Sequence, residues 1–163
     1  MGNFKEKGHE GVREVNENSK ETTDVGTEMT EQADQINSVL DGIELQDDED
    51  VQAIRETSQS YQSSFDSAFS EQVEASGEEI EQQGEQIKAS IEGELENVRS
   101  GIDKLEQAGG ISDIGKDAAD TGRQKLEGSG EEYEGIISET DKAVNDTKQK
   151  IESLKNNLSG IFG

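Results

Sequence analysis

Four consecutive acidic residues, Asp47 to Asp50, are the densest group of candidate metal ligands in the sequence. An EF-hand calcium loop needs carboxylates at alternating positions, a glycine at the sixth position and a glutamate at the twelfth. Counted from Asp47, the sixth residue is Gln52, so the calcium pattern fails. Acidic residues also stabilise the N-terminus of a helix, and Asp47 or Asp48 is suited to cap one. We therefore expect a helix start here and no metal site.

The residue types used in acid–base and nucleophilic catalysis are scarce. His9 is the only histidine, and the chain has no cysteine. A catalytic histidine needs an orienting partner and a substrate held beside it, and the polar neighbours of His9 supply neither. The turn at Gly109-Gly110 lacks the lysine and the preceding strand of a phosphate-binding loop. We expect no catalytic residue, no metal and no cofactor, and we classify the chain as not an enzyme.

The amino-acid composition limits the kinds of molecule that are expected to bind this chain. The 163 residues contain 39 Asp and Glu against 15 Lys and Arg, a net charge of -24. Such a chain repels nucleic-acid phosphates and anionic lipids, so neither is an expected partner. No stretch is apolar enough to span a membrane, and residues 1–10 have no apolar signal core. The expected location is cytoplasmic, or outside the cell without a cleavable signal peptide.

Three stripes of apolar residues, spaced by alternating steps of three and four, predict three long helices. They run from Val12 to Ile43, from Val51 to Leu105 and from Leu126 to Ile161, and the chain has no proline to interrupt them. We expect helices near residues 10–44, 50–107 and 112–160 in a single domain, 1–163, with residues 1–10 disordered. The predicted fold is all-α, an elongated antiparallel helical hairpin or three-helix coiled-coil bundle, because each helix has one stripe to bury.

Two stripes contain irregular positions. In the first, Ser19, Thr22 and Gly26 occupy seam positions, which predicts fraying in the N-terminal half. In the second, consecutive steps of four around Phe69 form a stutter that unwinds a left-handed supercoil locally. The small residues Ser76 and Gly77 follow, and the pattern leaves open whether the helix continues through them.

The segment Leu40-Asp41-Gly42 separates the first two stripes. Gly42 can adopt a positive φ where the first helix ends, and the acidic run then begins the second helix. We interpret Leu40, Asp41 and Gly42 as an elbow between helices.

This elbow also carries a family resemblance. An acidic helical chain without Cys or Pro, with an L-x-G elbow followed by an aromatic helix at Tyr61, Phe65 and Phe69, resembles the WXG100/ESAT-6/LXG group of bacterial type VII secretion. The resemblance covers residues 12–105 and implies a small accessory or targeting protein, or an effector N-terminal region, that pairs with another helical protein. The chain lacks W-x-G, and neither Tyr61 nor Tyr133 begins the Y-x-x-x-[DE] export signal. These departures favour a partner-assisted role.

The expected partner surface follows from the weak seams. Small and polar seam residues bury little apolar area, so the helices near the elbow are expected to be under-covered. A helical partner, basic or apolar-faced, would cover them, and homo-oligomers remain an alternative. The residues expected to bind the partner are Met29, Ile36, Leu40, Ile43, Val51, Ile54, Tyr61, Phe65 and Phe69. The alternative function is a structural coiled-coil component of a filament, phage or vesicle assembly, including one from a high-salt organism.

Overall fold

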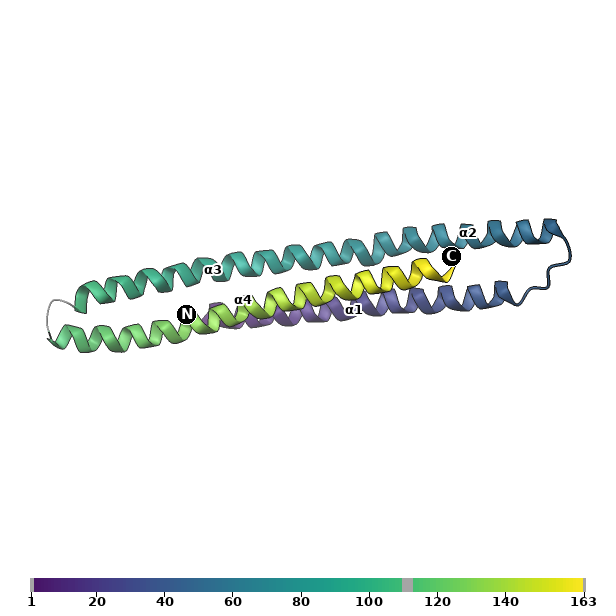
Figure 1. Cartoon of the computed structure of the whole chain (residues 1–163). Coiled ribbons are helices and arrows are strands. Elements are labelled where there is room, and N and C mark those ends of the chain that lie inside the picture. The colour runs from purple at the N-terminus through teal and green to yellow at the C-terminus, as the bar shows by residue number, and fades with distance from the viewer. Residues whose placement is uncertain (1, 110–112, 163) are drawn as a thin grey trace. The chain divides into compact units, whose positions relative to one another are not determined.

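The computed structural model describes the backbone of residues 2–109 and 113–162 and the side chains of residues 4–107 and 116–162. Within these residues the chain is all-α, with no strand, as the stripes predicted. The elements are α1 (Gly2–Asp41), α2 (Asp48–Phe69), the π-helix η1 (Ser70–Glu74), α3 (Ala75–Gly109) and α4 (Asp113–Ile161), in the order shown in Figure 1. The predicted turn residues 110–112 lie outside the described residues.

The second stripe forms one uninterrupted helical path through α2, η1 and α3. The junction residues Phe69, Ser70 and Ala75 all have right-handed helical backbone angles. Ser76 and Gly77 lie inside α3, so the helix does not break there. The stutter coincides with η1, where the wider π turn accommodates the extra residue. Phe69 and Val73, at the two ends of this turn, are both buried as a result.

The connection between α1 and α2 differs from the expectation at Gly42. No glycine among the described residues has a positive φ, so the left-handed elbow was wrong. Instead, the Gly42 amide donates to the carbonyls of Ser38 and Val39, each at 3.2 Å, and Ile43 donates to Leu40. These tight final turns satisfy the carbonyls at the end of α1 without a left-handed residue.

The start of α2 confirms the predicted cap. Asp47 is the N-cap, and its Oδ1 accepts a hydrogen bond from the Asp50 amide at 2.9 Å. The Asp50 carboxylate in turn accepts from the Gln46 amide at 3.1 Å. This reciprocal pair resembles a capping box, displaced by one residue. Asp48, Glu49 and Asp50 lie in the first turn, where the macrodipole favours negative charge.

The contacts divide the chain into two compact units. Unit 1 comprises residues 1–16 and 82–144, and unit 2 comprises residues 17–81 and 145–163. Each unit has its own apolar cluster with members from separate helices. The unit 1 cluster consists of Val12 from α1, Ile91, Leu95 and Val98 from α3, and Tyr133 and Ile136 from α4. The unit 2 cluster consists of Met29 and Ala33 from α1, Phe69 from α2, Val73 from η1, and Ile151 and Leu158 from α4.

The N-terminal residues correct a second expectation. Residues 1–10 were predicted to be disordered, but α1 begins at Gly2. Gly8 is buried, and a Cβ there would lie 3.0 Å from Ile136 and 3.1 Å from Ile91. Lys5 also forms an ion pair with Glu132 at 2.8 Å. The stripe analysis missed this segment because its packing depends on the absence of a side chain at Gly8.

The polar positions of the first stripe are buried rather than frayed. Ser19 and Thr22 are 8% and 7% exposed. Within unit 2, the Thr147 hydroxyl forms a hydrogen bond with Ser19 Oγ at 2.6 Å. A buried hydroxyl is tolerated when it is hydrogen-bonded, so this pair accounts for the polar seam. Gly26 is also buried, against Leu154, Phe69 and Val73.

Candidate functional site

The residues considered for catalysis or metal binding occupy ordinary positions on helices and helix caps. His9 is exposed on α1. Asp47 and Asp50 cap α2, as described above. In the part of the chain that the structure describes, no three His, Cys, Asp or Glu side chains converge to hold a metal ion. No described helix is both long and apolar enough to cross a membrane.

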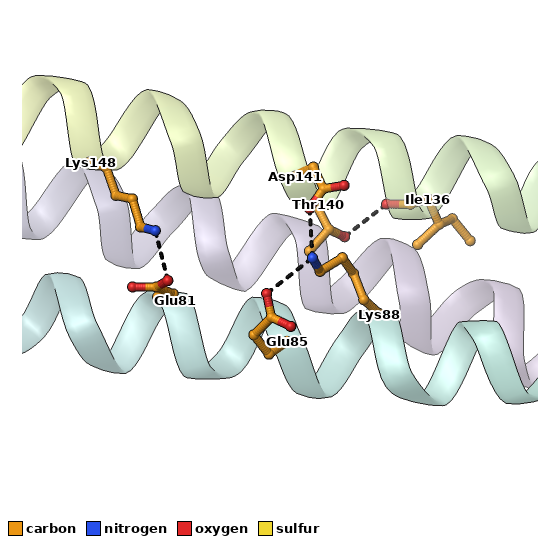
Figure 2. A network of polar contacts seen from close by, with 7 residues as sticks. All are labelled: Glu81, Glu85, Lys88, Ile136, Thr140, Asp141 and Lys148. Carbon is orange, nitrogen blue, oxygen red and sulfur yellow. Dashed lines mark hydrogen bonds and ion pairs between the residues drawn. The ribbon is translucent and has the colours of Figure 1, made fainter.

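Lys88 makes two short ion pairs in unit 1. Its Nζ lies 2.8 Å from Asp141 Oδ1 and 3.0 Å from Glu85 Oε1, so one ammonium bridges α3 and α4 (Figure 2). The hydrogen bond to Asp141, and then the one to Glu85, raise the pKa of Lys88 above its ordinary value of 10.5. A lysine with a raised pKa stays protonated and is a poor base or nucleophile. We therefore interpret this group as a clamp between helices.

A second contact in Figure 2 belongs to unit 2, where Lys148 Nζ lies 2.6 Å from Glu81 Oε1. Lys155 on α4 pairs with Glu74, the last residue of η1, at 3.2 Å. Both pairs border a groove of about 370 Å³ that also contains Gly77 and Ile151. Its two lysines, Lys148 and Lys155, are already paired with carboxylates, and Glu78 and Glu152 also line it. We therefore interpret the groove as a packing feature of unit 2.

Unit 1 has a groove of 410 Å³ between α1 and α3. Gly8 and Gly11 form its floor on α1, and Ile87 and Ile91 border it on α3. A Cβ at Gly11 would lie 2.8 Å from Ile87, so α1 approaches α3 closely here because Gly11 lacks a side chain. The lining combines apolar side chains and amides with the polar side chains of Lys7, Glu14 and Ser90.

Tyr133 is a buried residue of unit 1 with an unusual polar environment. It is fully buried, and its hydroxyl has no hydrogen-bond partner among the described residues. Burial raises the pKa of the phenol, and the charge of Glu94 adds to the effect. Its ring packs in the unit 1 cluster, so we assign Tyr133 a structural role in the apolar core of unit 1.

The predicted partner-binding residues separate into buried and accessible groups. Met29 and Phe69 are 8% and 1% exposed and belong to the unit 2 cluster. Met29 and Phe69 cannot contact a partner unless that cluster opens, so we no longer assign them to the partner-binding surface. Partly buried positions are Ile36, Leu40, Ile54 and Phe65, and exposed ones are Ile43, Val51 and Tyr61.

Tyr61 and Phe65 are partly covered by the end of the chain. The Phe162 ring stacks on Phe65 at a centroid distance of 5.9 Å and on Tyr61 at 6.4 Å. Tyr61 nevertheless remains 39% exposed. The stripes did not predict this contact, because Phe162 lies one residue beyond the third stripe and beyond α4.

Exposed apolar side chains gather around the α1–α2 connection. We name Val39, Ile43, Leu45 and Val51 the tip surface; they are 68%, 44%, 49% and 38% exposed. Val39 and Leu45 were not among the residues predicted to bind a partner. Their exposure could have been predicted from the sequence, because both are large apolar residues outside the first stripe and are therefore not expected to pack against another helix.

Almost all of the charged residues around the tip surface are acidic. Residues 21–87 contain 19 Asp and Glu but a single basic residue, Arg55. Residues 41–49 are all exposed, and Asp41, Glu44 and Asp47 to Glu49 lie among them. The exposed apolar side chains of the tip surface therefore lie among exposed carboxylates along residues 39–51.

Comparisons of the chain with protein-family models, with curated proteins and with solved structures gave no significant match. The function must therefore be argued from the residues and from the two units described above.

Proposed function

We propose that the protein is a non-enzymatic interaction protein that binds a helical protein through the α1–α2 end of unit 2. The observation that carries the proposal is the exposure of the tip surface. Large apolar side chains that remain exposed together on a highly charged chain are typical of a binding surface. Val39 is 68% exposed, although it lies on a long helix with a buried stripe nearby.

The architecture that we propose for this role is an antiparallel helical hairpin or three-helix coiled-coil bundle. Support comes from the membership of the two apolar clusters. Each cluster combines α1 and α4 with the α2–η1–α3 path. The steps of three and four along the three stripes are typical of knobs-into-holes packing. In unit 2, no residue from 39 to 51 belongs to the buried cluster.

The biological setting that the sequence suggests is bacterial type VII secretion. Its support is the position of Leu40-Asp41-Gly42 at the end of α1, followed by an aromatic helix. In this setting the protein is an accessory or targeting partner, or an effector N-terminal region.

Site-specific photocrosslinking tests the proposal. A photoreactive phenylalanine analogue would replace Ile43 or Leu45 in the full chain, expressed in its native cells. The control carries the same analogue at Gly135, which is exposed and has open space beside it. We expect one defined protein to be crosslinked from Ile43 and Leu45 and not from Gly135. Its identity by mass spectrometry should reveal a helical protein.

Two results would refute the binding surface. Equal crosslinking from all three positions would indicate non-specific encounters, and no crosslink from the tip would leave the exposed side chains without a partner. A crosslinked partner that modifies a small molecule only in the presence of this chain would contradict the non-enzymatic reading.

A further inference from the structure

The alternation of apolar and acidic residues at the tip restricts which partner can bind there. Asp41 and Glu44 flank Ile43 in sequence, and Leu45 is followed two residues later by the acidic run. Except for the partly buried Asp50, these side chains belong to the exposed segment 41–49. A helix that covers the apolar residues must therefore bring its polar face close to several carboxylates.

We propose that the tip surface binds a cationic amphipathic helix of another protein. Its apolar side chains cover Val39, Ile43 and Leu45, and its Lys and Arg side chains pair with the surrounding carboxylates. The inference rests on the proposed function and adds the chemical class of the partner. Complementary charge of this kind accelerates association and excludes wrong partners more than it adds affinity.

Other occupants fit the same surface less well. A second copy would place two acidic tips against each other, because residues 21–54 contain no Lys or Arg. Anionic lipid and nucleic acid are repelled for the same reason. A neutral helix would cover the apolar side chains but would also remove water from the neighbouring carboxylates without supplying a counter-charge.

Binding of three matched synthetic peptides to the full chain tests the inference. The basic peptide has leucines at helical spacings of three and four and lysines elsewhere, and about 14 residues give a helix of roughly 21 Å. A neutral peptide replaces every lysine by glutamine, and an acidic peptide replaces every lysine by glutamate. Affinities are measured by titration calorimetry at low and high NaCl, and the mass of the complex is measured by light scattering.

Three variants of the protein locate the binding site. The apolar variant removes the exposed tip side chains: Val39→Ser, Ile43→Ser and Leu45→Ser. The charge variant neutralises four acids at the tip and keeps the capping residues Asp47 and Asp50: Asp41→Asn, Glu44→Gln, Asp48→Asn and Glu49→Gln. The matched control neutralises four exposed acids in unit 1: Glu92→Gln, Asp103→Asn, Glu131→Gln and Glu139→Gln.

We expect the basic peptide to bind most tightly, in a complex with one protein chain. The apolar variant should weaken that binding at least about tenfold, the equivalent of about 1.4 kcal/mol. The charge variant should also weaken it about tenfold, and the control variant much less. Raising NaCl from about 0.05 M to about 0.5 M should reduce the affinity by a similar factor, because the Debye length shortens. Helicity by circular dichroism should be unchanged in all three variants.

The remaining outcomes separate this inference from the proposed function. If the neutral peptide binds as tightly as the basic one and the apolar variant binds neither, the tip is a docking surface but its partner is not cationic. If the control variant loses as much affinity as the charge variant, peptide binding depends only on the net charge of the protein and the inference is wrong. If no peptide depends on Val39, Ile43 and Leu45, the docking surface of the proposed function is wrong as well. A dimer of this chain that the apolar variant abolishes would identify a second copy as the occupant and would also overturn the inference.

Discussion

Gly84 offers a sharp test of how closely α3 and α4 pack in unit 1. It is buried, and a Cβ at this position would lie 2.5 Å from Val144 Cγ2 and 3.5 Å from Thr140 Cγ2. Carbon atoms pack best at about 3.5–4.0 Å, so Gly84→Ala requires a movement of about 1 Å. Val144 is buried and β-branched, which leaves it few alternative rotamers. We expect the helices to separate locally.

The magnitude follows from a comparison with Gly93 on the same helix. Gly93 is exposed, with nothing within 4 Å of a Cβ built there. Ala is favoured over Gly in a helix by about 1 kcal/mol, so Gly93→Ala should stabilise the protein by up to that amount. Gly84→Ala has the same propensity gain but adds an overpacking penalty of about 1–3 kcal/mol. The two variants should therefore differ in unfolding free energy by about 1–3 kcal/mol.

Urea unfolding followed by circular dichroism measures this difference. With an m value of about 1–3 kcal/mol/M, the two midpoints should differ by between about 0.3 M and about 3 M. A double-mutant cycle with Val144→Ala then tests the contact, because removing Cγ2 should relieve the strain. We expect a coupling energy of about 0.5–3 kcal/mol. Equal stability of Gly84→Ala and Gly93→Ala, or additive effects in the cycle, would refute close packing at Gly84.

Four further perturbations test other contacts. Tyr133→Phe should raise the unfolding free energy by about 1 kcal/mol, because it removes a buried hydroxyl without a partner; a less stable variant would mean that the hydroxyl is hydrogen-bonded in solution. Phe69→Ala should destabilise the chain by about 3–5 kcal/mol and the exposed Tyr61→Ala by much less, measured by the same urea assay; similar losses would contradict the burial of Phe69. Lys88→Met should lower the Tm, and the difference in Tm from the wild-type chain should persist from about pH 7 to about pH 10. The pKa of Lys88 is raised in the fold, so its contribution to stability is lost only as pH rises through that pKa. A difference in Tm that disappears near pH 9 would contradict this. The Tm of the wild-type chain should rise between about 0.05 M and about 1 M NaCl, because salt screens the repulsion from a net charge of -24; a constant Tm would count against this.

Local sequence features predicted the helical elements because their causes are local. Alternating steps of three and four place apolar residues on one helix face, and the absence of proline lets each helix continue. The Asp47 cap was predictable for the same reason, since its hydrogen bond spans only three residues. The accessible part of the candidate site was partly predictable, because Ile43 and Val51 lie where the stripes are interrupted.

Tertiary structure decided which residues of a stripe become buried and by what. Periodicity places Met29, Phe69 and Tyr61 on apolar faces but does not state which helix lies opposite each one. That depends on the register between segments distant in sequence, such as Ser19 and Thr147 or Tyr61 and Phe162. The packing against Gly8 depends on the same register, because it involves Ile136, a neighbour that the local pattern does not contain. The sequence by itself therefore determined an all-α chain with a capped, acidic α1–α2 connection. Only the packing of distant helices decided that Met29 and Phe69 lie inside and that Val39 and Leu45 remain exposed.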